Sequence, residues 1–249
     1  MSYLLVNENN IDNEHICCAI SNSTKDDRVI SKKSWMKENF ANGLKFVKLN
    51  ERGKVFIEYL PAEKAWSPTI APNYLFINCF WVSGKYVKQG HGSELLNICI
   101  EDAKKEGKDG LVILSSEKKM PFLSDSKFLK AKGFEVADKV GYFELLYLPL
   151  KNDSVIPKFN ETTKKLTIED DGIVIYYSNQ CPHTEMYVDA IEQIAQDNNL
   201  KFKKVKFDSY STAQEAPAPF TTYSFFDDGK FITNEIFSPK KFEKYLENK

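Results

Sequence analysis

Residues 74–107 constrain the fold of this chain most strongly, because they combine three patterns in a fixed order. The first ten are almost all apolar and rich in aromatic side chains. Such a run is too short to span a bilayer and is typical of a strand buried on both faces. A loop with Gly84, Gly90 and Gly92 follows, and apolar residues then recur at helical spacing as far as Gly107. The stretch predicts a strand, a glycine loop and an amphipathic helix.

The glycine loop is a candidate anion site. Glycines allow consecutive backbone N–H groups to point at one place, and the start of a helix adds partial positive charge, so phosphate is the usual ligand. A tight turn that merely contains glycines is the alternative, and Gly90 and Gly92 alone do not decide between the two. The loop lacks the full dinucleotide fingerprint and the Lys-Ser/Thr of a nucleoside-triphosphate loop, so neither of those sites is expected.

The composition is that of a globular protein in a reducing compartment. Of the 249 residues, 42% are apolar and 28% are charged. A net charge of −1 favours neither nucleic acid nor an anionic membrane as partner. No apolar run approaches the roughly 20 residues of a membrane helix, and the first residues do not resemble a signal peptide. Five cysteines without metal-type spacing favour the cytoplasm over a disulfide framework, so we expect a cytoplasmic protein without a metal site.

Periodicity and turn residues divide the first 150 residues into alternating strands and helices, with Ser31 or Ser34 as a candidate N-cap. We predict strands at 3–6, 45–49, 55–60, 74–83, 111–114 and 142–150, and helices at 14–20, 34–42, 93–106 and 122–132. This order predicts a mixed α/β fold.

A polar stretch with Pro149 and Pro157 then interrupts the pattern and predicts a linker. Beyond it we predict strands at 172–177, 202–207, 220–226 and 230–236, and helices at 184–197, 212–216 and 239–247. Asp228-Gly229 indicates a hairpin, and Ser238 before Pro239 indicates the start of the last helix. The second half therefore predicts a smaller α/β domain.

The glycine loop resembles the cofactor loop of the GNAT superfamily of N-acyltransferases, which reads Arg/Gln-x-x-Gly-x-Gly/Ala after a long apolar strand. Here it is Val87-Lys88-Gln89-Gly90-His91-Gly92, in which both glycines match and Val87 replaces the leading Arg/Gln. The predicted element order over residues 1–150 also matches that family. Residues 128–134, FLKAKGF, are similar to its Phe-Tyr-x-x-x-Gly-Phe motif, with Leu129 in place of the tyrosine that protonates the leaving thiolate of CoA.

The resemblance implies a GNAT-type mixed sheet with flanking helices and acetyl-CoA as co-substrate. Loop residues are expected to hold the pyrophosphate, and three strand residues to line the pantetheine arm or simply the core. These cofactor-binding candidates are Phe80, Trp81, Val82, Val87, Lys88, Gln89, Gly90, His91, Gly92 and Ser93. His91, in the middle of the loop, is expected at the surface. Backbone N–H groups at the strand edge 78–82 are expected to polarise the thioester carbonyl.

A carboxylate is the usual general base for such a reaction. Glu58 is the first candidate and Glu63 the second, against the alternative that each is a solvated surface group. Ser115, Ser116 and Ser124 are candidates for contact with the cofactor or the leaving thiol, against the alternative that they only form turns.

The second half resembles a thioredoxin-fold domain, whose reactive cysteine lies at the start of the first helix, as Cys181 does. A helix start lowers a thiol pKa, and His183 is a candidate partner of the thiolate. Thr184 stands where the second cysteine would be, so no local disulfide forms. Pro217 or Pro219 corresponds to that fold's cis-proline. Taken together, the two halves resemble the YoaP-type acetyltransferases.

These observations predict three parts: residues 1–150 as an acetyltransferase domain, 151–168 as a linker and 169–249 as a thioredoxin-like domain. The expected function is acetyl transfer from acetyl-CoA to a small-molecule amine by direct attack in a ternary complex. The alternatives are a thiol-based redox or sensing protein that uses Cys181, and a CoA-binding module without catalysis. A homodimer is compatible with the sequence, which does not identify the acceptor.

Overall fold

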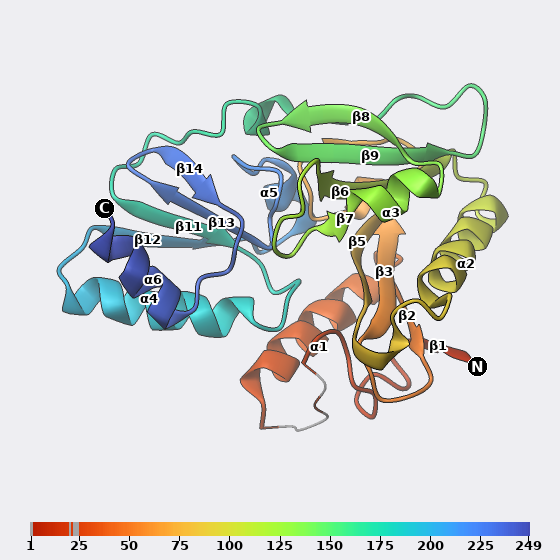
Figure 1. Ribbon diagram of the computed structural model, residues 1–249, viewed down its shortest axis with the longest axis horizontal. Coiled ribbons are helices and arrows are strands. Elements are labelled where there is room, and N and C mark those ends of the chain that lie inside the picture. The colour runs from red at the N-terminus through yellow and green to blue at the C-terminus, as the bar shows by residue number, and fades with distance from the viewer. Residues whose placement is uncertain (1, 20, 22–24) are drawn as a thin grey trace.

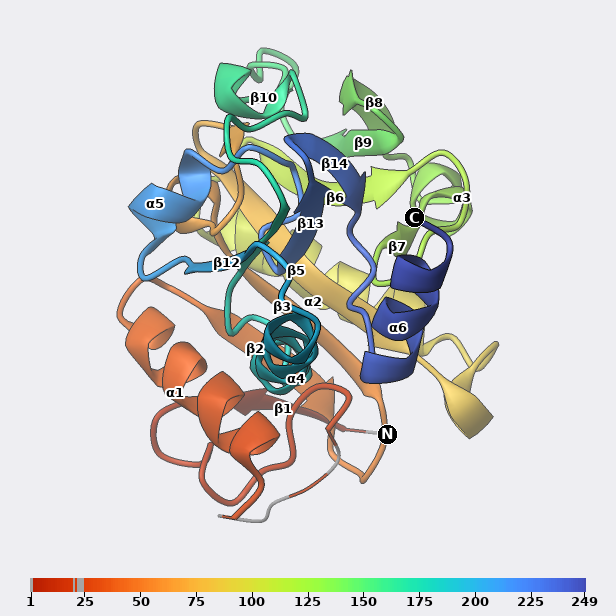
Figure 2. The same cartoon turned by 90° about the vertical axis from the view of Figure 1, so that its left-hand side faces the viewer.

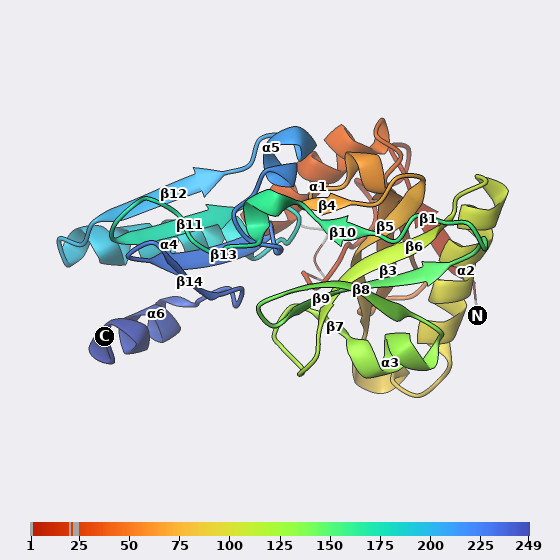
Figure 3. The ribbon, with the colours of Figure 1, turned by 90° about the horizontal axis from the view of Figure 1, so that it is seen from above.

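The computed structural model describes residues 2–19, 21 and 25–249, and its two halves lie side by side along the long axis (Figure 1). The N-terminal half is built on a large sheet and the C-terminal half on a four-stranded sheet. Seen from above, the two sheets follow one another along the molecule (Figure 3).

The N-terminal half contains β1 (Tyr3–Val6), α1 (Asp27–Phe40), β2 (Lys45–Leu49), β3 (Val55–Pro61), η1 (Ala62–Lys64), β4 (Thr69–Ile70), β5 (Tyr74–Val82), η2 (Gly84–Tyr86), α2 (His91–Lys105), β6 (Gly110–Ser116), β7 (Ser124–Asp125), α3 (Ser126–Ala131), β8 (Glu135–Val140) and β9 (Phe143–Pro149). Its main sheet has the order β1-β2-β3-β5-β6-β9-β8, and β7 also pairs with β6. Because β5 and β6 are parallel and most other pairs are antiparallel, the sheet is mixed, as predicted.

Helices cover both faces of the large sheet. Trp35 and Met36 of α1 are buried in one core cluster, whereas Leu95 and Cys99 of α2 and Leu129 of α3 are buried in another. The apolar stripe at helical spacing that predicted α2 is therefore its buried face.

Four expectations about local structure were wrong. The described residues 14–19 form bends and irregular backbone instead of a helix, and residue 20 lies outside the described part of the chain. Helix α1 begins earlier than predicted, because the side chain of Asp26 accepts a hydrogen bond from the Arg28 N–H and caps it in place of a serine. Helix α3 is shorter than predicted because Asp125 caps it and residues 124–125 pair with β6. Strand β8 was missed because its residues are polar and mostly exposed.

The C-terminal half contains β11 (Ile173–Tyr177), α4 (Thr184–Asp197), β12 (Phe202–Lys206), α5 (Tyr210–Gln214), β13 (Tyr223–Asp227), β14 (Lys230–Thr233) and α6 (Pro239–Glu247). Its sheet has the order β12-β11-β13-β14, in which only β11 and β12 are parallel. Val188 of α4 and Phe242 of α6 are buried in one cluster, so both helices cover the same face. No cis peptide bond occurs among the described residues, so the expectation of a cis-proline at Pro217 or Pro219 was wrong.

The two halves share a continuous interface. One core cluster includes Trp66 and Phe159 together with Phe207 of the C-terminal half. The segment between the halves carries β10 (Lys158–Phe159), which pairs with β4, and η3 (Glu161–Thr163). Helix α4 lies against α1, as Figure 2 shows. Among the described helices, none has the length and apolar character that crossing a bilayer requires.

Candidate active site

Strands β5 and β6 separate in the middle of the large sheet. They pair in parallel from Tyr74 opposite Gly110 to Ile77 opposite Ile113, and β6 then pairs with β7 instead. A bulge lies at the same level, because Glu58 pairs with Cys79 and Tyr59 with Ile77, which leaves Asn78 as the extra residue. The strand edge 78–82 therefore faces an opening.

A groove of about 910 Å³ lies beside this opening, between β5, the start of α2 and the segment 119–128. Nine of the ten predicted cofactor-binding residues line it: Phe80, Trp81, Val82, Val87, Lys88, Gly90, His91, Gly92 and Ser93. Gln89 is the exception, since its side chain donates a hydrogen bond to the Lys85 carbonyl instead. The end of β5 and the glycine loop thus line a single groove.

The start of α2 presents free backbone donors to the groove. Gly90 precedes the helix with φ +87°, a left-handed conformation that favours glycine, and no described side chain caps the helix there. The first N–H groups of a helix have no partner within it, and Gly92 and Ser93 at this position both line the groove. Lys88 and Lys119 add positive charge, so the arrangement suits a phosphate-bearing ligand.

His91 was expected at the surface, but it is buried, with only 4% of its surface exposed. A hydrogen bond of 2.8 Å joins its Nδ1 to the Tyr3 hydroxyl, and the rings of Tyr3 and Tyr86 contact it edge-on. Its buried Nε2 has no partner among the described residues. The imidazole therefore anchors the glycine loop to β1, a role that depends on a strand 88 residues away.

Glu58 is fully buried, so the alternative of a solvated carboxylate was wrong. Its Oε2 lies 2.6 Å from the Lys32 ammonium, which is also fully buried, and its Oε1 accepts a hydrogen bond from Asn78 Nδ2 at 3.4 Å. Burial alone would lower the pKa of Lys32, but the neighbouring Glu58 carboxylate raises it overall. Glu58 lines neither the groove nor the smaller pocket described below.

Glu63 and two of the serines have structural partners. Glu63 is exposed and its carboxylate accepts the Asn73 N–H at 2.6 Å, which holds a turn before β5. The Ser115 hydroxyl donates to the Ser124 carbonyl, and the Ser116 hydroxyl donates to the Lys118 carbonyl, each at 2.7 Å. Ser124 itself lines the groove.

Helix α3 presents Phe128 to the groove, where its ring centroid lies 5.7 Å from that of Phe80. Leu129, which occupies the tyrosine position of the family motif, is fully buried in the core. Neither side chain carries an acidic proton. Ser124 is therefore the hydroxyl closest in sequence to this position that lines the groove.

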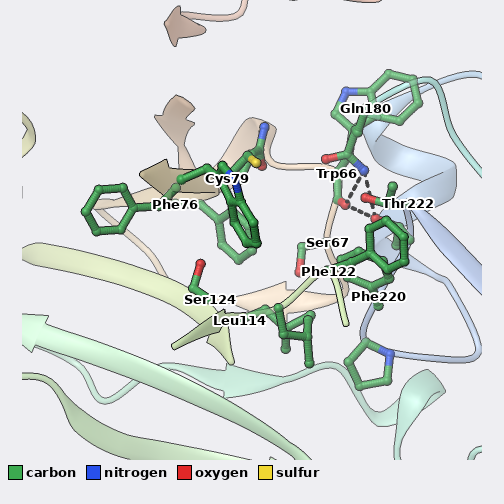
Figure 4. Close-up of a pocket in the computed structure, with 16 residues that line it drawn as sticks. Trp66, Ser67, Phe76, Cys79, Leu114, Phe122, Ser124, Gln180, Phe220 and Thr222 are labelled. Atoms are coloured by element: carbon green, nitrogen blue, oxygen red, sulfur yellow. Dashed lines mark hydrogen bonds between the residues drawn. The ribbon is translucent and has the colours of Figure 1, made fainter. Parts of the chain in front are cut away.

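A second, smaller pocket of about 40 Å³ lies between the two halves (Figure 4). The N-terminal half contributes residues such as Trp66, Ser67 and Asn78, and the C-terminal half contributes Gln180 and residues 219–222. The pocket and the groove share lining residues: Phe80, Trp81, Phe122, Leu123 and Ser124. The two spaces therefore meet where β5 diverges from β6.

The environment of Cys181 does not favour a thiolate. Cys181 lies just before α4 and is half-buried, and burial raises the pKa of its thiol to about 11. A hydrogen bond from the His183 backbone N–H lowers the pKa of the Cys181 thiol, but the effect of burial is larger. Burial also lowers the pKa of His183, with Arg28 and Lys54 adding to the effect, so an imidazolium partner is disfavoured.

We expect Cys181 to react slowly with iodoacetamide at pH 7. A thiol whose pKa is raised by burial to about 11, about two units above its ordinary value, has roughly 100-fold less thiolate at neutral pH. Its rate, followed by peptide mass spectrometry, should rise about tenfold per pH unit up to pH 10. Labelling at pH 7 as fast as that of a free cysteine peptide would contradict this environment.

Sequence reasoning missed two parts of the site. Residues 119–123 form the far wall of the groove, and only Pro121 signalled that they lie outside a helix. Lys32 carried no signal, because a lysine on an amphipathic helix normally points to solvent.

Comparison with known proteins gives the family. The model of the Acetyltransferase (GNAT) family matches residues 11–122, and a YoaP-like family model matches residues 201–244. A Bacillus subtilis (strain 168) protein named "Uncharacterized N-acetyltransferase YoaP" is 42% identical over 247 residues, which are 99% of this chain and 98% of that protein. This chain belongs to the GNAT family of N-acetyltransferases. Like other members of that family, it is an acyltransferase.

Solved GNAT structures are more distant. The PaiA N-acetyltransferase of Thermoplasma acidophilum, solved in complex with coenzyme A, is 14% identical over 60% of this chain and 99% of its own, with a TM-score of 0.41. The GNAT protein YhbS of Escherichia coli, solved in complex with CoA, is 13% identical over 64% of this chain and 89% of its own, with a TM-score of 0.42.

Proposed function

We propose that this GNAT protein transfers an acetyl group from acetyl-CoA, held in the groove, to the amine of a small molecule in a ternary complex. One observation carries the proposal. The groove runs from the uncapped start of α2 to the place where β5 and β6 separate, and there it meets a second pocket. If the acyl donor binds in one space and the acceptor in the other, the amine is held in line with the thioester carbon. Holding two reactants in this orientation can by itself supply a large part of the rate acceleration.

The cofactor would be held by residues of distinct chemistry. The first N–H groups of α2, with Lys88 and Lys119, suit the phosphates. Phe80, Trp81 and Val82 offer an apolar wall for the pantetheine arm. This assignment includes the loop residues predicted from the sequence, except that Gln89 holds the loop through its bond to Lys85.

The reaction needs a neutral amine. Its nitrogen forms a bond to the thioester carbon while the C–S bond breaks, and the sulfur leaves as a thiolate with the electron pair. Backbone N–H groups at the edge 78–82 would stabilise the negative charge on the carbonyl oxygen. The amine then loses its extra proton, which ends on the thiolate to give CoA. We propose Ser124, which lines both cavities, as the hydroxyl that hydrogen-bonds this sulfur.

We assign Glu58 a positioning role instead of direct proton transfer. It lies behind the cavity walls, and its Oε2 is paired with Lys32. Its other oxygen, Oε1, accepts a hydrogen bond from the amide nitrogen of Asn78. Glu58 would thereby fix the orientation of Asn78, which lines the smaller pocket.

We also propose that residues 1–150 form the acetyltransferase domain, 151–168 a connecting segment and 169–249 a thioredoxin-like domain. Supporting this, β11, α4 and β12 form a βαβ unit that is followed by β13, β14 and α6, with β11 in the interior of the sheet. The C-terminal domain would brace the active site, because the buried Asn234 donates a hydrogen bond to the Pro121 carbonyl in the groove wall.

The first test is thermal unfolding with acetyl-CoA, CoA or NAD⁺ added separately. A ligand at 100 times its dissociation constant stabilises a native protein by about 2.7 kcal/mol, and we therefore expect acetyl-CoA and CoA to raise Tm by about 5–10 °C. NAD⁺ should cause no shift. Absence of any shift with millimolar acetyl-CoA would overturn the proposal.

A further inference from the structure

We infer that Phe122 contacts the acyl end of the bound donor and excludes water from the thioester, and that its strained backbone holds the ring in place for this contact. The inference rests on the proposed function. It adds a ligand-contacting residue on the far wall of the groove, outside the glycine loop and outside the family motif.

The backbone of Phe122 has a conformation that this residue type disfavours. Phe122 lies in a turn directly after Pro121, and its φ is +64°. In this left-handed region the Cβ atom of an L-residue is crowded by the backbone, so glycine is favoured and asparagine or aspartate is tolerated. A glycine would make the same turn without strain. The turn alone therefore does not account for a phenylalanine here.

Strained residues of this kind occur at the groove. In the described part of the chain, seven residues other than glycine have a positive φ, and three of them are asparagine or aspartate. Of the other four, Lys88 and Phe122 line the groove, whereas Cys17 and Leu166 do not. Backbone strain clusters at active sites and ligand clamps, where the position of a side chain matters for the ligand.

Neighbouring groups hold Phe122 in this conformation. The Pro121 carbonyl, directly before it, accepts a hydrogen bond of 2.9 Å from Asn234 Nδ2. Asn234 is fully buried, and its Oδ1 accepts a hydrogen bond of 2.7 Å from the Tyr142 hydroxyl, which directs the amide nitrogen toward Pro121. Two residues after Phe122, the Ser124 carbonyl accepts a hydrogen bond from a serine hydroxyl of β6. A strained residue persists when its surroundings fix it in this way.

The Phe122 side chain contributes little to the core. It is 44% exposed and belongs to none of the core clusters formed by the described residues. It lines both the groove and the smaller pocket (Figure 4). Packing of the fold therefore does not explain the ring, whereas contact with a ligand in these spaces does.

The position of the ring assigns it to the acyl end of the donor. If the phosphates bind at the start of α2, the thioester lies at the other end of the groove, where the groove meets the pocket. Of the residues that line both spaces, Trp81 and Phe122 are the exposed ones, at 40% and 44%. Trp81 belongs to β5 and Phe122 to the far wall. Two aromatic side chains at this junction would cover the thioester and exclude water from its carbonyl carbon.

Water that reaches the thioester would consume the donor without acetylating an acceptor. The water oxygen forms a bond to the carbonyl carbon while the C–S bond breaks, and acetate and CoA are released. This side reaction requires no acceptor, so it can be measured with acetyl-CoA alone. An apolar ring at the junction should slow it.

The test compares Phe122→Ala and Phe122→Gly in the full-length protein, with acetyl-CoA as the only substrate. Both variants lack the ring, so both should release acetate about tenfold faster than the parent, as measured by proton NMR. In calorimetry, Kd for acetyl-CoA should rise about tenfold, whereas Kd for adenosine 3′,5′-bisphosphate, the nucleotide end of CoA, should stay unchanged.

The two variants should differ in stability without ligand. Glycine relieves the left-handed strain that alanine keeps, so Tm of Phe122→Gly should exceed that of Phe122→Ala by about 2–4 °C. Leu166 supplies the matched control, because its φ is +52° and it lines neither cavity. Leu166→Gly should likewise have a higher Tm than Leu166→Ala, but both should release acetate at the parent rate.

A purely structural role of the ring predicts that both Phe122 variants keep the parent rate of acetate release and the parent Kd for acetyl-CoA, and this result would overturn the inference. Equal Tm values for Phe122→Gly and Phe122→Ala would overturn the assignment of strain. If acetyl-CoA does not bind to the parent protein, the proposed function fails, and the inference fails with it.

Discussion

Replacing Gly92 with tryptophan is expected to reduce kcat/KM for acetyl-CoA by about 100-fold or more, because the indole would occupy the groove. A Cβ atom at Gly92 would lie 3.3 Å from Phe128 Cζ and 3.8 Å from Phe80 Cζ, both on groove residues. The larger indole must therefore extend into the space proposed for the cofactor. Steady-state kinetics and the loss of the acetyl-CoA thermal shift would measure the effect.

Lys105→Trp is the matched control, since it places the same side chain at the exposed end of the same helix. This variant should keep both activity and the thermal shift. The Tm of Gly92→Trp without ligand should stay close to that of the parent, because Gly92 lies beside a groove. A Gly92→Trp protein that still gains stability from acetyl-CoA would place the cofactor elsewhere.

Replacing Lys32 with methionine is expected to destabilise the protein by about 3–5 kcal/mol, because it leaves the Glu58 carboxylate buried without its counter-charge. The ammonium also lies 4.1 Å from the Trp35 ring centroid, and that contact is lost too. Urea unfolding at pH 7 would measure the loss. The double variant Lys32→Met with Glu58→Gln should recover much of it, since no unpaired charge then remains.

The same helix supplies the control for this prediction. Lys37 pairs with Asp12 at 2.7 Å, but both side chains are largely exposed, so Lys37→Met should change stability little. Equal effects of the two substitutions would contradict the assigned role of burial.

The pH dependence of the Lys32 contribution has a defined sign. The pKa of Lys32 is raised in the folded protein. A group of this kind contributes its full stabilisation below its unfolded pKa, which is about 10.4 for lysine, and loses it as pH rises through the folded value. The difference between the parent and Lys32→Met should therefore persist from pH 7 to about pH 10 and shrink only above that.

Local patterns predicted much of the fold and the groove. The apolar run before the glycine loop and the helical stripe after it predicted β5 and α2, and nine of the ten residues proposed from that stretch line one groove. The last helix also begins where Ser238 and Pro239 predicted, and spans the predicted residues 239–247. These features depend on residues close together in the chain, so their spacing carries the information.

Patterns failed where a partner distant in the chain decides the outcome. The early helix was predicted to begin at a serine cap, whereas Asp26 caps it several residues earlier. Only Glu58, across the core, explains why Lys32 on this helix is buried. His91 was expected at the surface because it lies in the middle of a loop, but Tyr3 on the distant strand β1 holds it in a buried position.

The sequence by itself determined the mixed α/β class, the strand–loop–helix unit and the position of the cofactor candidates, because hydrophobic period and glycine placement act over a few residues. Only the tertiary structure decided the rest: the buried pair of Lys32 and Glu58, the left-handed backbone of Phe122, and the pocket closed by Gln180 and Thr221. Each of these depends on packing between segments far apart in the chain, where burial, and not residue type, determines which polar groups keep a partner.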